Sequence, residues 1–183
     1  MRERIRVRGT VTVRVLDGAG RVRVVRPGFW GRLCGRGPVR VERRRHNIVT
    51  RQGDALIADA LLAVPLKARV CSATGFIQAG TGWTGNSTKT NTRCNTPSGA
   101  MEALDAGYPV LKAAWGAVGD TTVVYRATFE AGKLNANGIN EVALLNGSDA
   151  GAACLAYAQI SPVVNVTSID TLQIEWEITL LGQ

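Results

Sequence analysis

The feature that most constrains the fold of this chain is a strict alternation near its C-terminus. From Leu172 to Leu180 every second residue is large and apolar, and the residues between them are Gln173, Glu175, Glu177 and Thr179. A period of two is the repeat of a β-strand, whose side chains point alternately to two faces. Burial of each apolar side chain contributes roughly 1.5 to 3 kcal/mol. We therefore predict a strand over 172–180 at the centre of the core.

The same alternation occurs near the N-terminus. Between residues 5 and 15 the odd positions are mostly valine or isoleucine, and the even positions are arginine or threonine. This pattern predicts a strand with one arginine-lined face. Residues 17–20 accept tight turns, and Val22 and Val24 alternate with arginines after them. We therefore expect a basic β-hairpin in this part of the chain.

The rest of the chain alternates short strands with polar turns. A change of period after Thr50, which can cap a helix, predicts a helix of about three turns that ends before Pro65. One further turn of helix is expected around residues 101–104. Strands are predicted at 39–41, 76–79, 110–115, 121–129, 139–145 and 152–160. The fold class that follows is mainly β: an antiparallel β-sandwich with one short helix and an N-terminal basic β-hairpin extension.

Charge is divided unevenly along the chain. Residues 1–51 contain fifteen arginines and carry a net charge of +12, residues 52–183 carry −4, and the whole chain of 183 residues carries +8. We therefore predict a basic hairpin arm and loop over residues 1–46 and a β-sandwich domain over residues 47–183. Such separation lets copies of the chain attract one another head to tail, or lets the basic part bind an acidic surface.

The arginine face and the loop that follows it supply candidate protein contacts. Three hypotheses remain open for the arginines: docking on carboxylates of a neighbour, such as those of the C-terminal strand; a solvated edge that resists aggregation; and contacts with nucleic-acid phosphates, without interleaved aromatics to stack bases. An apolar pair on a glycine-rich loop can anchor in a neighbour's pocket. The candidates are Arg4, Arg6, Arg8, Arg14, Arg21, Arg23, Phe29 and Trp30.

No pattern in the sequence points to catalysis. His46 is the only histidine and follows three arginines, which favours a surface ring over a general base. Glu175 and Glu177 are expected to be solvated on an outer sheet face. The segment 80–82 (GTG) is too short to cradle a phosphate. We therefore expect no enzyme activity, no catalytic residue and no cofactor.

The four cysteines are scattered along the chain without a CxxC pair, and a single histidine is available as a further metal ligand. A metal site is therefore not expected. Buried thiols are one interpretation, and a disulfide between Cys71 and Cys94 across a loop is the other. No apolar leader and no run near 18 apolar residues is present, which predicts that a membrane is not a partner.

Several short motifs follow one another along the chain. They are the strand around Gly9, the stretch 46–50 (HNIVT) followed by Gly53, the GTG segment at 80–82, and the segments 121–129 (TTVVYRATF), 138–146 (GINEVALLN) and 172–180. In this order they resemble a family of tailed-bacteriophage virion structural proteins, described as capsid decoration, tail or collar-fibre components. Segments 29–37 and 81–106 depart from the pattern of that family.

The resemblance implies a non-enzymatic virion protein assembled in the host cytoplasm. The first function that it implies is that of a capsid decoration or cement protein, which stabilises the particle by binding major capsid or tail proteins. Such a protein is expected to form a homo-oligomer, in this case a trimer. The alternative is a tail-tip or collar-fibre protein that takes part in host attachment, in which Trp83, Asn86 and Asn91 would meet a glycan or receptor. Nucleic acid is a third and less favoured partner.

Overall fold

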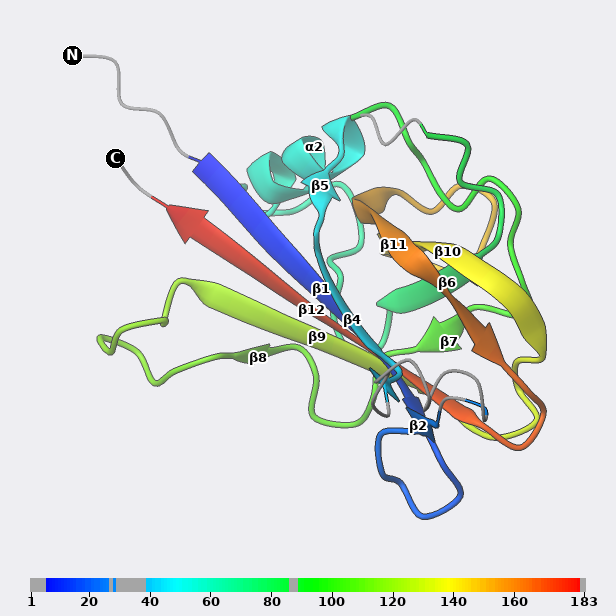
Figure 1. Cartoon of the computed structure of the whole chain (residues 1–183). Coiled ribbons are helices and arrows are strands. Elements are labelled where there is room, and N and C mark those ends of the chain that lie inside the picture. The colour runs from blue at the N-terminus through cyan, green and yellow to red at the C-terminus, as the bar shows by residue number, and fades with distance from the viewer. Residues whose placement is uncertain (1–5, 27, 29–38, 86–88, 182–183) are drawn as a thin grey trace.

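Two antiparallel sheets of five strands each pack face to face in the computed structural model, which describes residues 6–26, 28, 39–85 and 89–181 (Figure 1). The first sheet has the order β4 (Glu42–His46), β1 (Arg6–Leu16), β12 (Thr171–Leu181), β9 (Thr122–Phe129) and β8 (Val110–Leu111). The second has the order β5 (Ile48–Val49), β11 (Cys154–Val166), β10 (Ala136–Leu145), β6 (Phe76–Gly80) and β7 (Glu102–Ala103). β2 (Val24–Val25) pairs only with β3 (Val39–Arg40) among the described strands. The predicted mainly β sandwich is confirmed.

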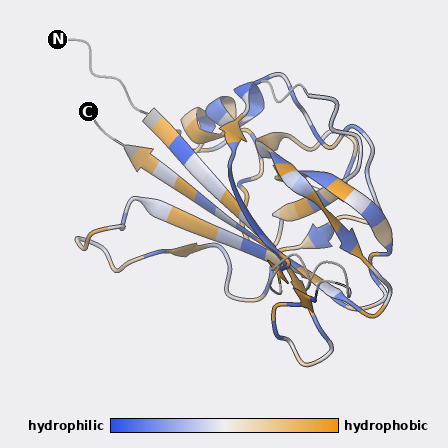
Figure 2. Ribbon diagram, in the orientation of Figure 1, coloured by the Kyte–Doolittle hydropathy of each residue, from blue (hydrophilic) through white to orange (hydrophobic). Residues whose placement is uncertain are grey.

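The two alternating segments of the sequence form the middle of the first sheet. β1 and β12 pair along their whole length, so that Val11 lies opposite Trp176 and Val13 opposite Ile174. All four side chains are fully buried between the sheets. Figure 2 shows the matching hydrophobic and hydrophilic bands along these strands. β1 is therefore part of the first sheet and contributes to the core between the two sheets.

The predicted turn after β1 is present. Asp17 closes it, since its Oδ1 accepts hydrogen bonds from the backbone amides of Ala19 (2.9 Å) and Arg21 (3.0 Å). Leu16 then bridges Val22 across the turn. The hairpin forms because an aspartate side chain substitutes for a backbone acceptor in a tight turn.

The second sheet is covered on both faces. Val142 and Leu144 of β10 point into the sandwich, whereas Ala143 and Leu145 belong to a second apolar cluster with Tyr157 on the opposite face. Residues 141–145 are all buried as a consequence. A strand with both faces covered reads as a continuous apolar run, which is the pattern of this stretch of the sequence.

The helix α2 (Arg51–Asp59) begins where the sequence predicts. Thr50 is its N-cap: the Thr50 hydroxyl accepts a hydrogen bond from Gly53 N (3.0 Å) and donates one to the carbonyl of Cys154. A Cβ at Gly53 would lie 2.0 Å from the Leu155 carbonyl oxygen, so only glycine allows α2 to approach β11 this closely.

α2 ends at Asp59, before Pro65 as predicted, and Leu61 lies outside the helix and is exposed. Two other predictions are wrong. The helical turn expected at 101–104 is instead strand β7, which pairs with β6. The strand expected over 110–115 ends at Leu111. In each case local periodicity is overridden by the partner that the backbone finds in the folded chain.

Candidate protein-binding surfaces

The arginine face of β1 lies beside acidic residues of its own chain. Arg14 Nε donates to Glu42 Oε1 (2.9 Å), and its Nη1 lies 3.7 Å from a Glu175 carboxylate oxygen. Glu177 is contacted by Arg44 (3.5 Å) and Lys112 (2.7 Å). The carboxylates of β12, which one of the three hypotheses paired with a neighbour's arginines, thus have basic partners within their own chain, on β1, on β4 and directly after β8. Such exposed pairs contribute about 0 to 1 kcal/mol each.

The other basic candidates lie at different places on the molecule. Arg8 is exposed on it, while Arg21 is exposed at the turn and lies 3.5 Å from Asp17. Arg23 instead reaches Asp170, which is 4% exposed, and donates to the carbonyl of Asn165 (2.7 Å). Arg23 therefore holds the turn before β12 and is not a free contact residue.

Asp170 is ionised in this arrangement. Burial alone would raise the pKa of Asp170, but the hydrogen bonds from the hydroxyl and amide of Thr167 and the Arg23 guanidinium outweigh it, so that the pKa lies below its ordinary value of 3.8. A buried carboxylate of this kind depends on its partners to remain charged.

Four of the predicted contact residues lie outside the described residues: Arg4, Phe29, Trp30 and Asn86. Arg6 belongs to β1, but its side chain is outside the description. The predictions for these positions therefore stay predictions.

A buried carboxylate organises the long polar loop after β6. Glu141, on the outer side of β10, has no exposed surface and accepts hydrogen bonds from the backbone amides of Gly82 (2.9 Å), Asn95 (3.0 Å) and Thr96 (2.9 Å). The Tyr157 hydroxyl donates a fourth (2.5 Å). These four hydrogen bonds fix both ends of the loop on the sheet.

Two neighbouring side chains extend this anchorage. Asn140 Oδ1 accepts from the amide of Trp83 (3.0 Å), and Gln78 Oε1 accepts from the amide of Cys94 (3.0 Å). A Cβ at Gly80 would lie 2.6 Å from Glu141 Oε1. The GTG segment therefore serves the close approach of the loop to Glu141. Sequence reasoning missed the role of Glu141, although an acidic residue inside the apolar run at 138–146 was the available signal.

The candidate receptor residues of this loop are held against the sheet. Trp83 is half-buried and packs on the apolar cluster that contains Cys94, Ala143 and Leu145, and Asn91 is also half-buried. The loop is therefore an ordered layer over β10 and β11, and Thr84 and Thr92 are among its exposed side chains.

The predicted disulfide is absent: Cys71 and Cys94 are both free thiols. Cys71 Sγ lies 3.1 Å from the Thr74 hydroxyl in the turn before β6, whereas Cys94 is buried and its Sγ lies 3.4 Å from the Gln78 carbonyl oxygen. Burial raises the pKa of the Cys94 thiol well above its ordinary value, and that of Cys154 to about 12. Both therefore behave as small buried apolar groups, the other interpretation drawn from the sequence.

The connection between β8 and β9 exposes apolar side chains. Trp115 is 89% exposed and Val118 fully exposed. Figure 1 shows this connection at the left edge of the molecule, on the side away from the second sheet. A second exposed group follows α2 and consists of Leu61, Leu62, Val64 and Leu66. Contiguous exposed apolar patches mark binding surfaces in many proteins, so these two groups are candidates for contact with other molecules.

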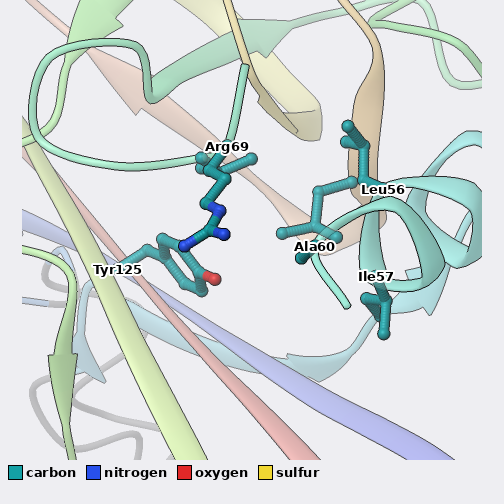
Figure 3. A pocket seen from close by; sticks show the side chains of 7 residues that line it. Leu56, Ile57, Ala60, Arg69 and Tyr125 are labelled. Carbon is teal, nitrogen blue, oxygen red and sulfur yellow. The ribbon is translucent and has the colours of Figure 1, made fainter. Parts of the chain in front are cut away.

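A cavity of about 190 Å³ lies between α2 and the first sheet. Its apolar lining comes from Leu56, Ile57 and Ala60 at α2, together with Val70 and Leu155. Figure 3 shows Arg69 and Tyr125 on the side opposite the α2 residues. Burial raises the pKa of the Tyr125 hydroxyl to about 12, so it is neutral and can donate a hydrogen bond near pH 7.

Comparisons with known proteins identify no relative of this chain: no family model, no curated protein and no solved structure matches it. In the described part of the chain no helix is long and apolar enough to cross a bilayer. The same residues include no group of three or more His, Cys, Asp or Glu side chains placed to hold a metal ion.

Proposed function

We propose that this chain is a non-enzymatic structural protein of a tailed-phage virion, which self-associates and binds neighbouring subunits of the particle surface. The observation that carries the proposal is the exposed apolar tip between β8 and β9, where Trp115 and Val118 have almost no contact with their own chain. Trp is among the residues that contribute most binding energy when they are buried at an interface.

The sandwich suits such a role. β1 and β12 pair over eleven positions, and the polar loop over the second sheet is held by Glu141. The tip itself is closed by hydrogen bonds from Ala117 N to the Ala114 carbonyl and from Gly116 N to Asp120, and such preorganisation lowers the entropy lost on binding. Many weak contacts, repeated over a symmetric particle, then add up to a stable coat.

The experiment that tests the proposal measures the mass of the free protein and its binding to particles that lack it. We expect an oligomer by sedimentation equilibrium, and particles that resist heating better after the protein is added. A monomer that does not bind such particles would contradict the proposal.

Host attachment is the second candidate function, and the anchored loop over β10 favours it. An ordered polar loop with Thr84 and Thr92 on its outer side suits recognition of a glycan or receptor. Deletion of the loop would remove the backbone donors of Glu141, so surface substitutions are the better test. If Thr84→Glu with Thr92→Glu lowers adsorption to cells but leaves particle stability unchanged, attachment is the function.

A further inference from the structure

We propose that Trp115 of one copy enters the cavity between α2 and β9 of a second copy of this chain. This inference rests on the self-association proposed above. It names the two surfaces that would make the contact, which are the apolar tip of one copy and the cavity of the other. The tip is a convex apolar group without a partner in its own chain, and the cavity is a concave apolar site at a different place on the same molecule.

The cavity has the size of one aromatic ring. Its volume is about 190 Å³, and an apolar cavity of about 150 Å³ is known to hold benzene. Its apolar walls, formed by Leu56, Ile57 and Leu155 among others, would exclude water from a ring that enters. An indole therefore fits it better than a long polar side chain does.

The polar groups of the cavity also suit an indole. Arg69 is exposed, and its guanidinium makes no hydrogen bond or ion pair with any described residue. A guanidinium over the face of a Trp ring contributes about 0.5 to 1 kcal/mol at exposed sites and more when desolvated. Tyr125 adds a second aromatic surface and a neutral hydroxyl.

Trp115 is the aromatic side chain best placed to be the occupant. Among the described tryptophans, Trp176 is fully buried and Trp83 is half-buried against the second sheet, whereas Trp115 is 89% exposed. The tip carries one further group that matches the cavity. Asp120 closes the tip by accepting from Gly116 N (2.8 Å), and it would bring a carboxylate toward the guanidinium of Arg69, which lines the cavity.

Sedimentation equilibrium of the full chain tests the contact with two single variants. Trp115→Ala removes the knob, and Ala60→Glu places a charged side chain at the mouth of the cavity, where Ala60 is exposed. We expect each change to raise the dissociation constant about 30-fold or more, the effect of losing an interface hot spot. Ile169→Ala, which shortens another exposed side chain, is the matched control and should leave the constant unchanged.

A mixture of the two variants distinguishes this contact from others. The Ala60→Glu chain keeps its tip and the Trp115→Ala chain keeps its cavity, so the mixture should associate more tightly than either variant alone. If Trp115→Ala associates as tightly as the wild type, or if the mixture associates no more tightly than either variant alone, this contact is wrong. Self-association by another surface would still be possible. A monomeric wild type would overturn both proposals.

Trp115-dependent binding to anionic lipid vesicles, with the oligomer unaffected, would assign the tip to a membrane instead. Unchanged thermal melting of both variants serves as the folding control.

Discussion

Two connections of this chain differ from what their composition suggests. One joins β6 to β7, and the other joins β8 to β9. The first is rich in Thr, Asn and Gly, yet its backbone is fastened to the core. The second contains Trp115 and Val118, yet it stands in solvent. The contrast teaches that a segment is held in place by the partners that its backbone finds, and that apolar side chains alone do not secure burial.

The two connections satisfy their backbone groups by different means. The polar loop gives its amides to side chains of the second sheet, chiefly Glu141. The apolar tip closes on itself, with hydrogen bonds from Ala117 N to the Ala114 carbonyl and from Thr122 N to the Gly119 carbonyl. The connection is bonded to β12 only near its two ends, by Lys112 to Glu177 and by Leu180 N to the Thr121 carbonyl, which leaves the apolar side chains between them free for a partner.

The largest expected effect is on the polar loop. Glu141→Ala would leave three part-buried amides and the buried Tyr157 hydroxyl without their acceptor, and we expect it to lower the free energy of unfolding by about 3 to 5 kcal/mol. Urea denaturation measures the change. Glu130→Ala, at an exposed carboxylate, is the control and should have an effect below about 0.5 kcal/mol. Similar stability for the two variants would break the comparison.

A second buried carboxylate separates the effect of burial from that of the loop. Asp170→Asn should lower the free energy of unfolding at pH 7 by about 1 to 3 kcal/mol, because it weakens the contacts with Arg23 and Thr167. The pKa of Asp170 is lower in the folded chain than its ordinary value of 3.8. The folded chain therefore binds fewer protons there, and the stabilisation is complete above that value and lost as the pH falls through the folded-state pKa.

The pH dependence is the measurement that checks this account. Wild type and Asp170→Asn are compared by urea denaturation at pH 7 and near pH 3. The difference between them should shrink at the lower pH. A difference that is constant, or that grows on acidification, would show that the charge of Asp170 is not what stabilises the turn.

A smaller effect is expected from one donor to Glu141. Tyr157→Phe removes a hydroxyl but keeps the buried ring, and should cost about 1 to 2 kcal/mol in the free energy of unfolding. Burial, together with the hydrogen bond to Glu141, raises the pKa of Tyr157, so the hydroxyl keeps its proton and can donate near pH 7. Tyr125→Phe is the matched control. An equal loss in both variants would mean that ring packing, and not the bond to Glu141, is being measured.

The smallest expected effect is on the apolar tip. Trp115→Ser should change the free energy of unfolding, measured at a concentration where the chain is monomeric, by less than about 0.5 kcal/mol. A loss above 1 kcal/mol would show that the tip packs on its own chain. The contrast between the two connections would then be false.

The motifs that resemble the phage family contain glycines at which two segments of the chain pack closely together. A Cβ at Gly9 would lie 1.8 Å from Asn47 Oδ1, and the Gly53 backbone lies against Leu155. Gly80 approaches Glu141 in the same way. The resemblance thus rests on residues that let backbone segments approach one another. Such residues are informative about fold, and a role on a particle needs the experiments given above.

Local sequence was sufficient for the features that depend on neighbours in the chain. The alternation at 172–180 predicted β12, Thr50 predicted the start of α2, and residues 17–20 predicted the turn. It was insufficient for β7 and for the pairing of Cys71, since these depend on which distant segment lies alongside.

The amino-acid sequence by itself determined that this chain forms amphipathic strands, because the period of two is a property of each strand alone. Only the tertiary structure decided that Glu141 is buried, that β1 lies in the middle of a sheet and that Trp115 stands in solvent. The physical reason is distance along the chain. Glu141 meets Thr96 across 45 residues, and no local pattern records which of two far segments will cover a face.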